Sequence, residues 1–438
     1  MLRTLSTHSN SNLVDFSSND YLSFSQSNIL KQNLLNDLEQ LSFGSKQDCD
    51  ESPFGPPSSR LLDGNSKHHL NLEQQLTQFF RSESGLLFNS GFDANVGVWS
   101  CLPSKQDWIV FDSLIHASVH DGMRASRVPK HQRISFQHNN VQDLERKLCE
   151  IKQADQQVRQ GKSAVWIGIE TLYSMDGDLA PVKEMLQVVE RSLPLGNGHM
   201  IVDEAHSTGL YGPQGRGVVC ALGLANRITV RVHTFGKAMA CSGGVVLASP
   251  TLRSYLINYA RPLIYSTAMP RMNVLAIKQS FLMLERGQGD EAACHVHRLS
   301  TNLLNQLSTF LSSTSTPVAL PDHVTNEQTL SSGVPANITK IQSNEPTSVA
   351  TTLQPMVTTS PIIPLLTTKP HALSNYLIQQ GFLIRPIAYP TVPKGQERIR
   401  ICLHANNTFE QIEQLSECLK TWCLDQRNQT IDNVVSKL

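Results

Sequence analysis

Short apolar runs alternate with helical stretches between about residues 70 and 250, and this alternation constrains the fold more than any other feature of the chain. The runs are rich in Val and Ile and occur at four places, Trp108–Phe111, Ala164–Glu170, His199–Asp203 and Ile228–His233. Stretches with helical spacing, such as Leu70–Phe80 and Val141–Lys152, flank them. Short apolar runs bounded by polar or turn residues are typical of buried strands in a parallel sheet. We therefore predict an α/β fold with a mostly parallel central sheet.

The composition changes in the C-terminal third. Arg271–Arg286 has the pattern of a long helix, and residues 311–360 are then rich in Ser, Thr, Pro and Asn. Such a segment, with weak periodicity, predicts an insertion that is at least partly disordered. The pattern beyond it predicts a smaller α/β unit, with strands at Ile362–Leu366 and Arg398–Leu403 and helices over Ala372–Gln380 and Glu410–Leu424.

The charge balance excludes two classes of partner. Lys plus Arg and Asp plus Glu each total 37, so the formal net charge is zero. A chain without a basic field does not attract nucleic acid or an anionic membrane, and no apolar run reaches the length of a membrane span. The nine cysteines form no CxxC pair, which favours a reduced intracellular compartment over a disulfide framework. We predict no metal site, no nucleic acid partner and no membrane partner.

Two strand ends carry side chains of chemical interest. Asp203 ends one predicted strand, and His206 follows three residues later. Another strand ends near Thr234, and Lys237 follows in a turn of small residues. Ligands of open α/β sheets bind beyond the carboxyl ends of the strands. Alone, Asp203 could be a helix cap and Lys237 a solvated loop lysine, but together they match what pyridoxal 5'-phosphate needs: a lysine for its aldehyde and an acid for its ring nitrogen.

Two further stretches fit the same cofactor. The segment from Phe88 to Asn95 reads as a turn that opens a helix at Gly91, and a helix N-terminus binds phosphate through its free N–H groups. His116 lies where an imidazole could cover a flat ring, although an ordinary surface or core histidine is an equally good interpretation.

Six ordered motifs together resemble the α-oxoamine synthases. The motifs are LLFNSGFDAN, HASVHDGMR, YSMDGD, VDEAHSTG, HTFGKA and ARPLIYSTAMP, and the resemblance runs from DFSSNDYL at Asp15 to RIRICLHA at Arg398. These are fold-type I pyridoxal-phosphate enzymes that join an acyl-CoA to an amino acid. The resemblance implies an N-terminal segment over residues 1–50 that packs with the small domain. It further implies a large cofactor-binding domain over 51–270 and a small α/β domain over 271–438.

The resemblance also assigns roles to the residues around the cofactor ring. Lys237 would bind the cofactor aldehyde as a Schiff base and later move the α-proton of the substrate. Asp203 would pair with the ring nitrogen, His206 would hydrogen-bond the phenolic oxygen, and His116 would stack on the ring.

Other residues would hold the phosphate. The resemblance places main-chain groups of Gly91 and Phe92 and the hydroxyl of Thr234 at the phosphate, and it makes Ser174 a further cofactor contact. Thr267 would reach the phosphate of the neighbouring subunit, which implies a homodimer with a shared active site.

The substrate residues follow in the same way. Asn19 and Arg400 match positions that hold the amino acid, with Arg400 pairing its carboxylate, and Thr391 lies at a family substrate contact. Within the family, VHTFGKA and LIYSTAMP are most similar to the members that condense L-alanine with pimeloyl-CoA in biotin biosynthesis. The alternatives are glycine C-acetyltransferase, 5-aminolevulinate synthase and serine palmitoyltransferase. A catalytically inactive partner subunit, which would lack the lysine, and an aminotransferase, which shares the fold, are also possible.

The last three residues, Ser436, Lys437 and Leu438, match the C-terminal signal that the peroxisomal import receptor reads. We expect import into peroxisomes, where β-oxidation could supply a medium-chain dicarboxylic acyl-CoA; otherwise the protein would be cytoplasmic.

Overall fold

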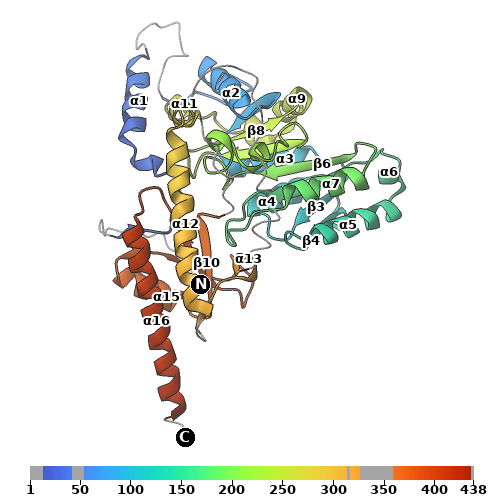
Figure 1. Cartoon of the computed structure of the whole chain (residues 1–438). Helices are drawn as coiled ribbons and strands as arrows, with labels where there is room; N and C mark the ends of the chain where they lie inside the picture. The colour runs from blue at the N-terminus through green and yellow to red at the C-terminus, as the bar shows by residue number, and fades with distance from the viewer. Residues whose placement is uncertain (1–12, 42–53, 313–315, 326–358, 436–438) are drawn as a thin grey trace, which may run out of the picture.

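A twisted sheet of seven strands forms the centre of the molecule in the computed structural model, which describes residues 13–41, 54–312, 316–325 and 359–435 (Figure 1). Its strand order is β2-β8-β7-β6-β5-β3-β4, and every neighbouring pair is parallel except the two pairs that contain β8. The mostly parallel sheet predicted from the sequence is confirmed. Its strands are β2 (Ser84–Phe88), β3 (Trp108–Asp112), β4 (Arg133–Phe136), β5 (Val165–Glu170), β6 (Gly198–Asp203), β7 (Val230–Thr234) and β8 (Gly244–Ala248).

Helices cover both faces of this sheet because its strands alternate apolar side chains between two cores. In β6, Ile201 packs into the smaller core under α3 and α4, whereas Val202 packs into the larger core. Successive side chains of a strand point to opposite faces, so a strand covered on both sides reads as one continuous apolar run. The helices are α2 (Lys67–Phe79), α3 (Gly91–Cys101), α4 (Ala117–Ala125), α5 (Val141–Ala154), α6 (Gln156–Arg159), α7 (Val182–Ser192), α8 (Val218–Ala221), α9 (Pro250–Tyr259), α10 (Arg261–Ile264) and α11 (Arg271–Glu285).

A second sheet of four strands, in the order β12-β13-β10-β9, forms the C-terminal part of the chain. Its pairs are antiparallel, and the helices α12 and α16 run beside it (Figure 1). The elements of this part are α12 (Gln288–Ser312), β9 (Val318–Ala319), α13 (Asp322–Thr325), β10 (Ile362–Thr367), α15 (Pro370–Gln379), β11 (Phe382–Leu383), β12 (Arg385–Ile387), β13 (Arg398–Cys402) and α16 (Phe409–Val435).

The N-terminal segment joins this second part. Strand β1 (Val14–Asp15) pairs in parallel with β11, and the main-chain N–H groups of Cys402 and Ala405 donate to the carbonyls of Phe16 and Tyr21. Helix α1 (Asn28–Glu39) lies instead against α11, where Lys278 forms an ion pair with Asp37 at 3.0 Å. The N-terminal segment therefore bridges the two sheets.

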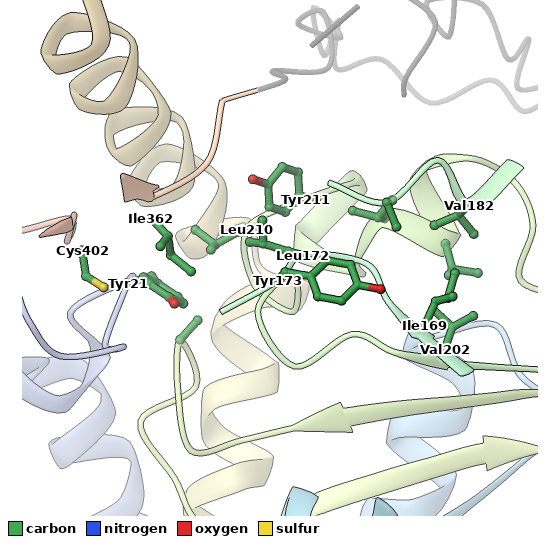
Figure 2. Packing of buried hydrophobic residues seen from close by; sticks show 14 of the residues in the cluster. Tyr21, Ile169, Leu172, Tyr173, Val182, Val202, Leu210, Tyr211, Ile362 and Cys402 are labelled. Carbon is green, nitrogen blue, oxygen red and sulfur yellow. The ribbon is translucent and has the colours of Figure 1, made fainter. Parts of the chain in front are cut away.

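One apolar core runs continuously from the large sheet to the small one. Figure 2 shows Ile169 and Val202 of the large sheet at one end of the cluster and Ile362 and Cys402 of the small sheet at the other. Tyr21 from the N-terminal segment lies beside the small-sheet residues. Packing within this shared core fixes the position of the small sheet and the N-terminal segment relative to the ends of β5 and β6.

Several expectations are not tested by these elements. The domain boundaries at residues 50 and 270 stay predictions. Helix α11 follows the second boundary, yet its Phe281 packs against Phe79 and Phe80 beside the large sheet. Most of the predicted insertion (residues 313–315 and 326–358) and the tail Ser436, Lys437 and Leu438 lie outside the described residues. Among the residues that are described, no helix combines the length and apolar character needed to span a bilayer.

Candidate active site

The carboxyl ends of β5, β6 and β7 meet at one edge of the large sheet, and predicted site residues gather there. Glu170, the last residue of β5, is the register partner of Asp203, the last residue of β6, and Asp203 also pairs with Val232 of β7. Thr234 ends β7, and Lys237 follows it by three residues. Parallel strands bring their carboxyl ends to the same edge, so the topology itself assembles this cluster.

Asp203 is buried and held at both carboxylate oxygens. The side-chain amide of Asn95 donates to its Oδ2 at 2.7 Å, and the main-chain N–H of Ala205 donates to its Oδ1 at 2.8 Å. Each oxygen of an ionised carboxylate can accept more than one hydrogen bond. The carboxylate is therefore oriented and still able to accept a protonated ring nitrogen.

Lys237 is half-buried and has an altered pKa. Burial lowers its pKa below the ordinary 10.5, whereas the nearby carboxyl groups of Asp203 and Glu170 act in the opposite direction and Arg400 adds to the lowering. A lowered pKa makes the neutral amine more available at physiological pH, and that form attacks aldehydes and accepts protons.

Glu170 is a buried acid beside these groups. Burial and the charge of Asp203 raise its pKa well above the ordinary value, and it accepts a hydrogen bond from the main-chain N–H of His116. The carboxyl group thus fixes the backbone at the start of α4.

His206 is buried and hydrogen-bonded to Tyr21 of the N-terminal segment. Its Nδ1 lies 2.8 Å from the hydroxyl oxygen of Tyr21, and that hydroxyl donates its one hydrogen to Oδ1 of Asn19 at 3.2 Å. Burial and the positive charges of Lys237 and Arg400 hold its pKa well below 6.5, so this imidazole is neutral.

His116 caps the N-terminus of α4. Its Nδ1 accepts from the main-chain N–H of Ser118 at 3.2 Å and lies 2.8 Å from the hydroxyl of the same residue. The ring remains exposed beside Phe92, with the ring centroids 6.4 Å apart at a steep angle. Partial desolvation lowers the pKa of His116, and Asp203 opposes that effect.

The N-terminus of α3 forms a tight cradle with the end of β7. The first residue of the helix is Gly91, and a Cβ atom added there would lie 2.8 Å from the Thr234 side chain, too close for any other residue. Ser90 caps the helix by accepting from the N–H of Asp93 at 3.0 Å. The remaining N–H groups of the first turn and the hydroxyl of Thr234 suit a phosphate group. Phe92 follows in the same turn.

The small sheet contributes the substrate end of the site. Arg400 on β13 donates to Oδ1 of Asn19 at 3.1 Å and to the carbonyl of Ser174 at 2.9 Å. These contacts join three segments far apart in sequence and leave the guanidinium beside the histidine and lysine described above. A fixed guanidinium with further donors is suited to binding a carboxylate.

Two predicted site residues contribute no side-chain hydrogen bond to this cluster in the described part of the chain. The carbonyl of Thr267 accepts from the side-chain amide of Asn89 at 2.7 Å, which places it next to the phosphate cradle, but its hydroxyl has no assigned role within one subunit. Thr391 is exposed in the connection between β12 and β13, where its N–H donates to Ala388. Its predicted substrate contact stays a prediction.

The residues that are brought together fit pyridoxal 5'-phosphate. A lysine with a lowered pKa, an oriented carboxylate, a neutral buried imidazole and a glycine-walled phosphate cradle match the aldehyde, ring nitrogen, phenolic oxygen and phosphate of that cofactor. Sequence reasoning did not single out Asn95, Ser118, Tyr21 or Glu170. Each lies inside or beside a quoted motif, but its partner lies on another element, so spacing alone could not identify it.

The fold and the site define a fold-type I pyridoxal-phosphate enzyme. The chain belongs to the aminotransferase class I and II family, whose model matches residues 11–419, and within it to the α-oxoamine synthases. An 8-amino-7-oxononanoate synthase of Emericella nidulans is 41% identical over 412 residues, which cover 94% of this chain and 90% of that protein.

The chain is also similar to proteins that carry other names. The aminoacyl transferase sphA of Aspergillus fumigatus is 32% identical over 99% of this chain and 84% of its own length. The structure of a serine palmitoyltransferase of Sphingomonas wittichii superposes with a TM-score of 0.74 at 24% identity, covering 93% of this chain and 86% of that one. The latter identity supports the fold alone.

Proposed function

We propose that this protein condenses L-alanine with pimeloyl-CoA to give 8-amino-7-oxononanoate, CoA and CO2, a reaction of biotin biosynthesis. The observation that carries the proposal is the 41% identity to the Emericella nidulans 8-amino-7-oxononanoate synthase over 94% of the chain. The presence of Lys237, Asp203 and His206 in one cluster supports an active enzyme rather than an inactive partner subunit.

The chain's own residues account for binding and for proton transfer. Arg400, oriented by Asn19 and the carbonyl of Ser174, binds the carboxylate of alanine. Lys237, whose pKa is lowered, accepts the α-proton of the amino acid and returns a proton to the product.

Asp203 and His206 would hold the cofactor ring at its nitrogen and its phenolic oxygen. When bound, pyridoxal 5'-phosphate supplies an electron sink that stabilises a carbanion at the α-carbon of the amino acid. In the overall reaction, a bond forms between the α-carbon of alanine and the acyl carbon of pimeloyl-CoA. CoA leaves as its thiol, and the alanine carboxylate leaves as CO2.

A selectivity assay tests the substrate assignment. Purified protein with cofactor is offered alanine, glycine and serine, each with pimeloyl-CoA, acetyl-CoA, succinyl-CoA and palmitoyl-CoA, and free CoA is measured. We expect the highest kcat/KM for alanine with pimeloyl-CoA and no release of CoA by Lys237→Ala. Preferred turnover of serine with palmitoyl-CoA would instead support a function like that of serine palmitoyltransferase, and preferred turnover of glycine would support one of the two glycine-dependent alternatives.

We also propose a homodimer in which Thr267 reaches the phosphate bound by the partner subunit. Large apolar side chains are exposed near Thr267, with Tyr265 72% and Leu62 71% exposed, and a hydrogen bond from Ala268 to Ser58 joins their two segments. Exposed apolar groups that gather on one face are a common sign of a subunit interface.

The assembly proposal is tested by a charged substitution at the expected interface. Tyr265→Glu should lower the molar mass in solution toward that of one chain and weaken cofactor binding at the same time. Leu195→Glu is a matched control, since Leu195 is 62% exposed in the connection that precedes β6, at the opposite edge of the sheet. A monomeric wild-type protein that binds the cofactor fully would contradict the shared site.

We further propose that the Ser436-Lys437-Leu438 tail directs import into peroxisomes. The support is the match of these three residues to the signal that the import receptor reads. A fluorescent fusion with the tail at its free C-terminus should be peroxisomal and should become cytoplasmic when the last three residues are removed. Peroxisomal localisation of the truncated fusion would contradict a role for the tail.

A further inference from the structure

Asp203 and His116 are joined by a chain of hydrogen bonds through two buried polar side chains. The amide nitrogen of Asn95, on α3, lies 2.7 Å from Oδ2 of Asp203 and 3.1 Å from the hydroxyl of Ser118, on α4. That hydroxyl lies 2.8 Å from Nδ1 of His116. Asn95 is 3% exposed and Ser118 is fully buried, so the two bonds donated by Asn95 are shielded from water, whereas the ring of His116 is exposed.

The chemistry of the groups determines the direction of each hydrogen bond. An ionised carboxylate only accepts, so the nitrogen and not the oxygen of the Asn95 amide must face Asp203. The amide nitrogen has two hydrogens, and the second is donated to the hydroxyl oxygen of Ser118. The carbonyl oxygen of Asn95 has no partner among the described residues, so this orientation of the amide is set by its two donated bonds.

The state of His116 follows from the last bond of the chain. The main-chain N–H of Ser118 can only donate, and it donates to Nδ1 of His116. Nδ1 is therefore unprotonated, and its one lone pair is shared between this N–H at 3.2 Å and the hydroxyl hydrogen of Ser118 at 2.8 Å. The imidazole is then neutral with its hydrogen on Nε2, which is the ring's single donor.

We propose that Asn95 and Ser118 are positioning residues that orient the Asp203 carboxylate and hold His116 as the neutral tautomer with its hydrogen on Nε2. The chain runs in one direction, from the amide to the hydroxyl to the imidazole, so each bond strengthens the donor of the next. The inference rests on the cofactor site of the proposed function but not on the identity of the acyl-CoA. The orientation of the Asp203 carboxylate and the tautomer of His116 are thereby coupled through Asn95 and Ser118, which touch neither the amino acid nor the acyl-CoA.

Three substitutions separate this role from ordinary core packing. Asn95→Leu keeps the volume and removes both donated bonds, Ser118→Ala removes the hydroxyl, and Ser118→Thr restores one. Asn197→Leu is the matched control, because Asn197 is also buried and donates two hydrogen bonds from its amide, to the carbonyls of Val158 and Ser163. It precedes β6 at the end of the strand opposite to Asp203.

The first measurement is the protonation of His116 by nitrogen NMR of the full chain without cofactor, with its signal assigned by loss in His116→Gln. The other titratable and charged groups near the ring are Asp203, Lys237, Asp121, Glu170, His120 and His206, and they are unchanged in every variant. We expect the wild-type ring to carry its hydrogen on Nε2. Loss of one hydrogen bond to Nδ1 in Ser118→Ala should raise the pKa of His116 by roughly half a unit to one unit. Ser118→Thr should reverse this shift.

The decisive variant is Asn95→Leu, which does not contact His116. It should raise the pKa of His116 in the same direction, and it should weaken the binding of pyridoxal 5'-phosphate by about tenfold to a hundredfold, since Asp203 loses a donor to a charged group. The control Asn197→Leu should change neither quantity, whatever its effect on stability.

Three results would overturn the inference. They are a wild-type His116 with its hydrogen on Nδ1, a His116 pKa unchanged in Asn95→Leu, and an equal loss of cofactor affinity in Asn95→Leu and Asn197→Leu. None of these readouts uses an acyl-CoA, so failure of the alanine and pimeloyl-CoA assay would leave the inference standing, and its own failure would leave the substrate assignment intact.

Discussion

His138 lies between two aspartates, the fully buried Asp112 and the partly buried Asp178, and this arrangement predicts a measurable dependence of stability on pH. Its Nδ1 is 2.8 Å from Asp112 at the end of β3, and its Nε2 is 2.7 Å from Asp178. Both partners are acceptors, so both ring nitrogens donate and the imidazolium is the bound form. Although burial acts against the charge, the two aspartates raise the pKa of His138 from 6.5 to about 10.

The size of the effect follows from that shift. Each pKa unit corresponds to about 1.4 kcal/mol, so the rise of the His138 pKa on folding corresponds to at most about 5 kcal/mol of unfolding free energy. Desolvation of Asp112, which is fully buried, offsets part of this, and we expect a net contribution of about 2 to 3 kcal/mol. Because the folded pKa is raised, the contribution is complete below pH 6.5 and is lost as the pH rises toward 10.

The perturbation is His138→Asn, compared with the wild type by urea unfolding at several pH values from 6 to 9.5. The difference in unfolding free energy should be largest near pH 6 and should shrink steadily toward alkaline pH. His131→Asn serves as the control, since His131 is an exposed histidine in the turn before β4. A difference that is constant with pH, or that grows as the pH rises, would refute the assignment of a cationic His138.

Three further predictions concern the active site. Arg400→Met should raise the KM for alanine by about a hundredfold, because a charged partner of the substrate carboxylate is lost, and steady-state kinetics would contradict this if only kcat changed. Tyr21→Phe removes the hydroxyl between His206 and Asn19 and should lower kcat/KM by about tenfold. An unchanged kcat/KM would show that this hydrogen bond does not contribute to catalysis. The pKa of His206 lies well below 6.5, so its NMR signal should not titrate between pH 6 and 8, and a midpoint within that range would contradict its neutral state.

The strand ends that bear the site could be predicted from the sequence because each lies in one continuous apolar run. The run that ends at Asp203 became β6 with a shift of one residue at its start, and the run before Lys237 became β7. Burial on both faces makes such strands apolar throughout, so their type and their ends are readable without tertiary information.

Other parts of the fold required tertiary information. Strand β8 was not among the predicted strands, although its residues 245–248 are themselves a short apolar run, and β2 and β7 pair with it on both sides. Helix α16 was expected to end at Leu424, but it continues to Val435. Local sequence is a weak guide where pairing with distant segments or packing decides the conformation.

The candidate site divides in the same way. Lys237, Asp203 and Gly91 belong to local motifs whose residue types reveal their chemistry. The contacts that orient them, such as Asn95 with Asp203 and Tyr21 with His206, join residues more than one hundred positions apart. No sequence periodicity relates positions so far apart, so these contacts could be identified only in the folded structure.

The most direct test of the proposed function is the carbon balance of the reaction with L-alanine that carries an isotopic label on its carboxyl carbon. With pimeloyl-CoA and the cofactor, the account predicts one labelled CO2 for each CoA released and an unlabelled 8-amino-7-oxononanoate, with none of these products from Lys237→Ala. Label retained in the condensed product, or release of CoA that does not depend on alanine, would contradict a decarboxylative condensation at this site.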